Sequence, residues 1–189
     1  MKENDVMNES KMGNPAPLGL LGFGMTTILL NLHNAGLLPL SIVIVAMGCC
    51  LGGAAQIIAG MMEFRKGNTF GATAFTAYGF FWWSLVLIWW NPFGGIEWAT
   101  PAAMGWYLLL WGVFTLFMAI GTLKHNVASR VVFFSLTALF LLLAAGDFTG
   151  LEVITRIAGV VGIVCGASAV YNAMAQVVNE EFGKVIMPL

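Results

Sequence analysis

Neutral polar side chains within long apolar runs are the residues of this sequence best suited to binding a solute. Each such group costs energy at the depth of a bilayer unless it has a partner or faces water. Hydrogen bonds between helices explain most Ser and Thr side chains in such runs. The larger amides of Asn31, Gln56 and Asn172 are equally suited to lining a water-filled path. The sequence leaves packing and solute binding open for these three residues.

Charged residues are missing from the middle of every apolar run in the sequence, which disfavours a buried relay of carboxylates for moving protons. Glu63 ends the second run, whereas Glu97, Asp147 and Glu152 are expected in loops at the outer side of the membrane. A proton would therefore travel on a neutral acid, or by way of Glu63 and His33 at opposite mouths of a pathway.

The sequence contains no pattern of residues that is suited to metal binding, to a disulfide or to catalysis. Cys49, Cys50 and Cys165 all fall in apolar runs, where a thiol behaves as a small hydrophobic group. His33 and His125 have no second ligand at a spacing that suits a metal. The sequence offers no paired carboxylates and no nucleophile beside a base. We expect no metal, no cofactor and no enzyme activity, and a membrane enzyme or scaffold is the least favoured class.

These polar residues must be positioned by membrane helices. Of the 189 residues, 59% are hydrophobic and 9% are charged, which excludes an ordinary soluble domain. A bilayer core of about 30 Å needs about 20 apolar residues per helix. We predict an all-α integral membrane protein whose six transmembrane helices lie at residues 17–36, 39–62, 70–90, 104–123, 130–146 and 154–176.

The basic residues predict the orientation, because Lys and Arg in short loops stay in the cytoplasm. With both termini inside, only Arg156 of the eight basic residues falls outside. The expected organisation is a mobile cytoplasmic tail at 1–13, a transport domain at 14–178 and a short cytoplasmic tail at 179–189. The N-terminal tail lacks the apolar core of a signal peptide. The seven basic residues on the cytoplasmic side would be Lys2, Lys11, Arg65, Lys66, Lys124, Arg130 and Lys184.

The first run opens with two prolines in a pattern typical of a helix start. Asn14 is expected as the N-cap and Pro15 at the first helical position, where no amide donor is lost. The positive end of this helix could attract a small anion at the cytoplasmic mouth. Because two prolines remove donors, a segment that only fixes the helix start is the simpler interpretation.

Several short segments resemble those of acetate uptake transporters, also called succinate-acetate permeases. The resemblance covers nearly the whole chain. Its most specific part is the signature motif Asn14, Pro15, Ala16, Pro17, Leu18, Gly19 and Leu20, and it continues through residues 22–27, 31–34, 53–60, 67–71, 110–117 and 165–169.

The resemblance implies a six-helix protomer with its own pore, assembled into a ring-shaped homohexamer in the plasma or inner membrane. It also implies transport of acetate, and in some members succinate, together with protons. A constriction in the pore would be formed by Phe23, Tyr78 and Leu136, one residue from each of helices 1, 3 and 5. No nucleic-acid partner is expected. A passive channel for small anions or neutral solutes remains the alternative, because it needs no titrating residue.

An anion that crosses such a constriction must lose water, which costs several kcal/mol or more without compensation. We therefore expect acetate to be held on either side of the constriction by neutral donors. The candidates are Thr26, Asn31, Gln56 and the Tyr78 hydroxyl. The width at Leu136 would set the largest acid that passes.

Overall fold

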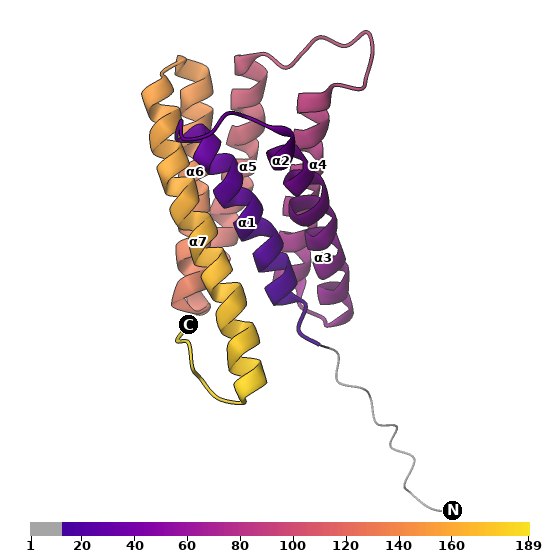
Figure 1. Ribbon diagram of the computed structural model, residues 1–189, viewed down its shortest axis with the longest axis vertical. Helices are drawn as coiled ribbons and strands as arrows, with labels where there is room; N and C mark the ends of the chain where they lie inside the picture. Colours follow the sequence, from indigo (N-terminus) through magenta and orange to yellow (C-terminus); the bar gives the residue numbers. More distant parts are fainter. Residues whose placement is uncertain (1–12) are drawn as a thin grey trace, which may run out of the picture.

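The computed structural model describes residues 13–189, and its regular elements there are all helices, joined by turns and loops (Figure 1). Six of its helices, some of them joined end to end, are long and apolar enough to cross a membrane. The predicted tail 1–13 lies outside the described residues except for Gly13. The spans are α1 Ala16–Asn34; α2 Ile42–Met47 with η1 Gly48–Ala55 and α3 Gln56–Arg65; α4 Thr69–Trp90; α5 Pro101–Gly121 with η2 Thr122–Lys124; α6 Val127–Thr149; and α7 Glu152–Phe182.

The six predicted spans match these helices, but the last two helices run further than predicted. The α6 helix continues to Thr149, where Gly150 adopts φ 67° and ends it. Asp147 therefore lies in the last turn of α6, so its assignment to a loop was wrong. A polar residue is tolerated there because a helix end reaches the headgroup region. The α7 helix runs from Glu152 to Phe182, six residues past its predicted end at 176, so the assignment of Glu152 to a loop was also wrong.

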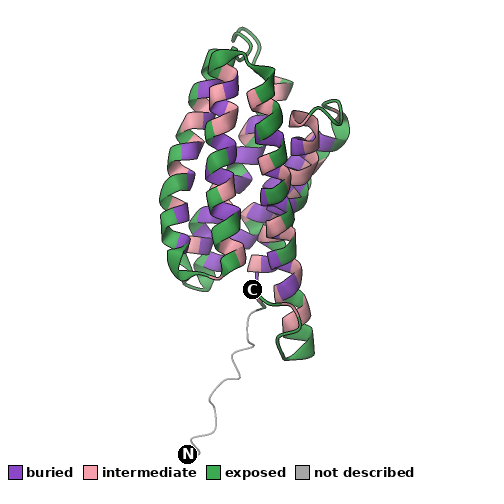
Figure 2. Cartoon of the chain, turned by 90° about the vertical axis from the view of Figure 1, so that its left-hand side faces the viewer, coloured by how far each residue is buried: buried purple, intermediate pink, exposed green. Residues whose placement is uncertain are grey.

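Small residues let the helices of the bundle pack closely. The α1 helix lies along α7, and α7 also packs against α6. A Cβ atom on Gly24 would lie 2.7 Å from the Gly166 carbonyl oxygen, and one on Gly166 would lie 2.7 Å from the Gly24 oxygen. The α1–α7 contact therefore requires glycine on both helices. Figure 2 shows the buried residues facing the inside of the bundle and the exposed ones facing outward.

A π-helical segment, η1, occupies the middle of the second span and ends directly before Gln56. Carbonyl groups in this segment and just before it accept hydrogen bonds from side chains on other helices. The Trp83 indole donates to the Cys49 oxygen at 2.8 Å, and the Thr26 hydroxyl lies 3.5 Å from the Met47 oxygen. Segments of this type occur frequently at functional sites.

The start of α1 and the end of the chain lie at the same end of the bundle (Figure 1). Residues after Phe182 fold back along α7 and do not extend away from it. The Asn179 amide oxygen accepts the backbone N–H groups of Ile186 at 2.7 Å and Met187 at 2.8 Å. The Tyr171 hydroxyl donates to the Pro188 oxygen at 2.7 Å. Residues 186–188 of the predicted C-terminal tail are thus hydrogen-bonded to α7.

Candidate functional site

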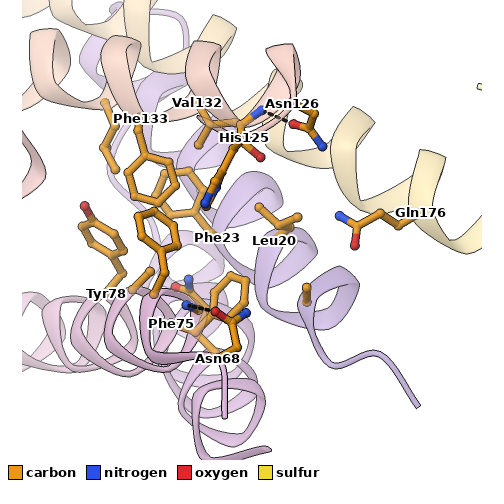
Figure 3. A pocket seen from close by; sticks show the side chains of 17 residues that line it. Leu20, Phe23, Asn68, Phe75, Tyr78, His125, Asn126, Val132, Phe133 and Gln176 are labelled. Atoms are coloured by element: carbon orange, nitrogen blue, oxygen red, sulfur yellow. Dashed lines mark hydrogen bonds between the residues drawn. The ribbon is translucent and has the colours of Figure 1, made fainter. Parts of the chain in front are cut away.

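A cavity of about 290 Å³, here called the vestibule, lies between α1, α4 and α6 (Figure 3). It extends from the end of the bundle where these three helices begin toward the middle of the bundle. From Ala16 to Phe23 the α1 wall covers eight residues, which corresponds to a rise of about 10 Å along the helix. The remaining apolar wall comes from Leu20, Phe70, Gly71, Ala74, Phe75, Val132 and Phe133.

The floor of the vestibule consists of Phe23, Tyr78 and Leu136, here called the ring. They come from α1, α4 and α6, and their exposed fractions are 6%, 3% and 3%. The Phe23 and Tyr78 ring centroids are 6.0 Å apart. The structure therefore brings together the three residues for which the family resemblance implies a constriction.

The Tyr78 hydroxyl is engaged elsewhere. It donates to the Thr115 hydroxyl at 2.9 Å, and Thr115 donates to the Trp111 carbonyl at 2.7 Å. Phe114 packs against the same phenol at 5.5 Å between centroids. Tyr78 therefore contributes an aromatic surface to the floor, and its oxygen is held in the contact between α4 and α5.

Gln56 is the one predicted binding residue that lines the vestibule. Its side chain is 1% exposed, and its amide oxygen has no hydrogen-bond partner within residues 13–189. A Cβ atom on Gly22 would lie 3.4 Å from the Gln56 Cγ atom, which places Gln56 at the level of the ring. A buried amide without a partner is costly, and this one borders a cavity that could hold a polar ligand.

Thr26 and Asn31 are buried but do not line the vestibule. The Thr26 hydroxyl donates to the Gly22 oxygen at 2.8 Å, and the Asn31 amide donates to the Thr27 oxygen at 2.9 Å. Both therefore satisfy their polar groups within α1. They follow Phe23 along the helix, so they lie beyond the ring.

Two buried groups beyond the ring were not selected from the sequence as binding residues. The Thr27 hydroxyl and the Trp82 indole nitrogen have no hydrogen-bond partner in the described part of the chain, and both side chains are 2% exposed. Thr27 stands four residues after Phe23, and Trp82 stands four residues after Tyr78. Residues four apart share a helix face, so both groups lie one turn above the ring. This spacing is the sequence signal that could have identified them.

A polar group of residues, here called the rim, surrounds the mouth of the vestibule. Sequence reasoning did not select these residues as a site. Two of them cap helices: the Asn68 amide oxygen accepts the Gly71 N–H at 3.1 Å, and the Asn126 oxygen accepts the Ser129 N–H at 2.8 Å (Figure 3). Each cap stands ten residues before a ring residue, a repeat visible in the sequence. The rim consists of Asn68, His125, Asn126, Ser129 and Gln176.

The signature motif builds one side of this mouth. The α1 helix begins at Ala16 with Pro15 as its N-cap, so the predicted cap at Asn14 was one residue too early. The Asn14 amide instead joins three segments. Its oxygen accepts the Lys66 ammonium at 2.9 Å and the Ala16 N–H at 3.3 Å, and its nitrogen donates to the Gln176 oxygen at 2.9 Å. Further along the motif, Gly19 lies against the Phe75 ring, so that α1 approaches α4.

The two residues proposed for proton transfer lie at opposite ends of the bundle. Glu63 is fully buried at the vestibule end, where its Oε2 atom accepts the Asn68 amide at 2.7 Å. Its Oε1 atom is buried without a partner among the described residues. His33 lies in the last turn of α1 at the other end, with its Nδ1 atom 3.0 Å from the Leu38 oxygen. Asn68 lines the vestibule, and Glu63 therefore lies directly behind Asn68 in the vestibule wall.

Comparisons with known proteins agree with this architecture. The chain is 56% identical over 184 residues to the succinate-acetate/proton symporter SatP of Escherichia coli K12, covering 97% of this chain and 98% of the relative. It is 39% identical over 179 residues to the ammonia transport outward protein 2 of Saccharomyces cerevisiae, covering 90% of this chain and 64% of that protein. A solved structure of the bacterial acetate channel SatP, also 56% identical, superposes with a TM-score of 0.93 over 95% of this chain and 99% of that one. The model of the GPR1/FUN34/yaaH family matches residues 2–188, and this multi-pass membrane protein therefore belongs to that family.

Proposed function

We propose that this protein carries acetate, and also succinate, across a membrane together with protons, through a pathway within each protomer. The observation that supports this most directly is the pairing of an apolar ring with the buried Gln56 amide beside it, whose oxygen has no partner among residues 13–189. The Gln56 NH2 group can donate to a carboxylate, its unpartnered oxygen can accept from a carboxylic acid, and the ring can contact a methyl group. Small aliphatic acids combine both features.

The ring acts as the constriction in this proposal. A carboxylate that leaves water at Phe23, Tyr78 and Leu136 needs donors on both sides to offset its lost hydration. The NH2 group of Gln56 would supply one such donor on the vestibule side. On the far side, Thr27 and Trp82 offer free donors directly above the ring, and Thr26 and Asn31 belong to the same half of the pathway.

Glu63 and His33 are the proposed proton-linked residues. An ionised Glu63 draws the Asn68 amide toward itself and places a negative charge next to the vestibule. A protonated Glu63 removes that charge, which favours an anion in the vestibule. Proton and substrate would then bind together, as symport requires. His33 would exchange protons at the opposite mouth.

A passive acetate channel is the second candidate. Within residues 13–189 no carboxylate lines the vestibule, and the similar solved structure is described as a channel. Both mechanisms share the same ring and the same binding groups. They differ only in whether a proton gradient drives accumulation.

The assembly proposed for this chain is a ring-shaped homohexamer in the plasma or inner membrane, with both termini in the cytoplasm and no enzyme activity. The vestibule would then open to the cytoplasm. Lys66 lies at this end, as its bond to Asn14 requires, whereas Arg156 follows the outer loop before α7. Residues 14–178 would form the transport domain between tails at 1–13 and 179–189. Large apolar side chains such as Trp106, Leu110 and Phe117 on α5 are exposed and suit lipid or a neighbouring protomer.

The decisive test is uptake of labelled acetate into proteoliposomes that contain the purified protein, with and without an inward proton gradient. Accumulation above equilibrium that ends when the gradient is dissipated supports symport. Equilibration to the same level in both conditions supports the channel. Absence of acetate flux would refute the substrate assignment. Protein-free liposomes and the Phe23→Ala and Tyr78→Ala variants serve as controls for the whole experiment.

A further inference from the structure

Glu63 has few hydrogen bonds for a fully buried carboxyl group. Its side chain is 0% exposed, and its Oε2 atom accepts the Asn68 amide nitrogen at 2.7 Å. Its Oε1 atom has no partner among residues 13–189, and none of these residues forms an ion pair with it. Buried charges are normally paired or fully hydrogen-bonded. A single side-chain hydrogen bond therefore holds this carboxyl group, and it comes from a residue that lines the vestibule.

Asn68 uses both ends of its amide. The nitrogen donates to Glu63, and the oxygen accepts the Gly71 N–H at 3.1 Å and so caps α4 (Figure 3). The backbone N–H of Asn68 also donates to the Glu63 carbonyl oxygen at 3.0 Å, which keeps the two residues adjacent. Asn68 is exposed at the mouth of the vestibule. The same side chain thus contacts the buried carboxyl group and borders the cavity.

A proton on Glu63 does not fit this arrangement of donors. On Oε2 the proton would meet the Asn68 N–H group, and on Oε1 it would be buried without an acceptor in the described chain. An unsatisfied buried donor is costly. A half turn of the Asn68 amide removes the conflict, because the amide oxygen then accepts the Glu63 proton. The NH2 group is released from Glu63 and needs a new acceptor, and the Gly71 N–H loses its cap.

A small carboxylate in the vestibule can be that acceptor. We propose that Asn68 couples proton binding at Glu63 to carboxylate binding at the mouth of the vestibule. The protonated Glu63 donates to the Asn68 oxygen, and the Asn68 NH2 group donates to the carboxylate. An ionised Glu63 instead holds the NH2 group and repels the anion. Because the turned amide no longer caps α4, it is favoured only when proton and anion are both bound.

This position is an entry site and is separate from the one at Gln56. Asn68 stands ten residues before the ring residue Tyr78, which corresponds to about 15 Å of helix. Gln56 lies at the level of the ring. One small acid therefore occupies one position at a time and does not span both. The inference rests on the proposed transport function and names the residue that links its proton to its substrate.

The surroundings of Glu63 contain no second carboxyl group. Its helix packs against α1, η1 and α4, and Glu63 is the only acidic residue in these four elements. On its own segment Arg65 and Lys66 are exposed, and Lys66 donates to Asn14. Beyond the start of α4, His125 lies edge-on against Phe70 with 4.7 Å between ring centroids. The other titratable side chains of α1, η1 and α4 are His33, Cys49, Cys50 and Tyr78.

Calorimetry of acetate binding to the detergent-purified protein tests this coupling. Titrations near neutral pH in two buffers of different ionisation enthalpy give the number of protons taken up with each acetate. The wild type should take up as much as about one proton, because a proton that favours the anion is favoured by it to the same extent. Asn68→Ser keeps an oxygen to cap Gly71 but has no amide to turn. It should bind acetate with proton uptake near zero, and gradient-driven accumulation in proteoliposomes should fall by about fivefold.

Two matched variants separate the amide of Asn68 from its role as a cap. Asn68→Gln keeps an amide but is not a favoured cap, so it should lower the unfolding temperature more than Asn68→Ser and retain part of the proton uptake. Asn126→Ser makes the same substitution at the cap of α6, where Asn126 accepts the Ser129 N–H at 2.8 Å and bonds no carboxyl group of the described chain. Whatever it does to affinity, proton uptake per bound acetate should equal that of the wild type. If Asn68→Ser does not fold, Asn68→Thr takes its place, because it also offers a cap oxygen and no amide.

Wild-type proton uptake in Asn68→Ser, or an equal loss in Asn126→Ser, would overturn the role of Asn68 and leave the transport function standing. Acetate binding by the wild type without proton uptake would also overturn it, and the pathway would then be a channel. If the wild type neither binds acetate nor takes it up, the proposed function fails, and this inference fails with it.

Discussion

The floor and the rim of the vestibule lie at opposite ends of one cavity, and they are built by different physics. The floor is an apolar ring whose three side chains are almost fully buried. The rim consists of polar residues that end helices, cap them or join them through amide hydrogen bonds. We therefore expect the floor to limit which apolar groups pass, and the rim and Gln56 to decide which charged groups enter. Changes at either place should therefore separate size from charge selectivity.

The largest expected effect comes from Gln56→Leu, which removes the polar group at the junction of floor and vestibule. A hydrogen bond to a charged group contributes about 1.5–3 kcal/mol, so acetate affinity should fall by about 10-fold to 100-fold. Thermal stability should not fall, because the Gln56 oxygen has no partner to lose. Acetate binding and unfolding temperature measured on the same preparation check both halves. A large loss of stability with normal binding would show that Gln56 is a structural residue.

The next effect in size concerns the floor. Leu136→Ala widens the ring, so larger acids such as lactate and succinate should compete with acetate uptake several-fold more strongly than in the wild type. The substitution also removes buried methyl groups and should cost about 2–5 kcal/mol of stability. Competition assays in proteoliposomes measure the change in selectivity.

Leu139→Ala is the matched control for the floor. Leu139 is buried on the same helix at 4% exposure but does not line the vestibule. It should show a similar loss of stability and no change in competition. Unchanged competition in Leu136→Ala, or an equal change in both variants, would show that the ring does not set the size limit.

A smaller effect is expected at Glu63, which lies behind the rim. Glu63→Gln keeps the shape of the side chain and an acceptor for Asn68 but cannot carry a proton. Accumulation of acetate driven by a proton gradient should fall by about fivefold, the lower end of typical coupling energies, while equilibration without a gradient continues. Undiminished accumulation in Glu63→Gln would exclude this residue from the coupling. His33→Gln provides the parallel test at the other mouth.

The floor was more predictable than the rim, and the residues show why. The apolar runs indicated six helices, and the resemblance to a known family pointed to Phe23, Tyr78 and Leu136, which one cavity then brings together. Rim residues such as Asn126 and Gln176 look like ordinary polar residues near helix ends, and only the folded chain shows that they surround one opening. Thr26 and Asn31 were plausible as polar residues at membrane depth. A sequence does not reveal that each satisfies its side chain on its own helix.

The smallest effect on transport is expected at Asn14, where the rim is held together but no substrate group is contacted. Asn14→Ala removes the bonds to Lys66 and Gln176, each of which contributes about 0.5–1.5 kcal/mol, so the unfolding free energy should fall by about 1–3 kcal/mol. Acetate uptake should fall less than about twofold, because the ring and Gln56 remain in place. Asn14→Asp keeps the acceptor for Lys66 but cannot donate to Gln176, so it should lose less stability than Asn14→Ala. If Asn14→Ala abolished uptake while the protein stayed folded, Asn14 would belong to the transport pathway. The rim and the floor would then not have separate roles.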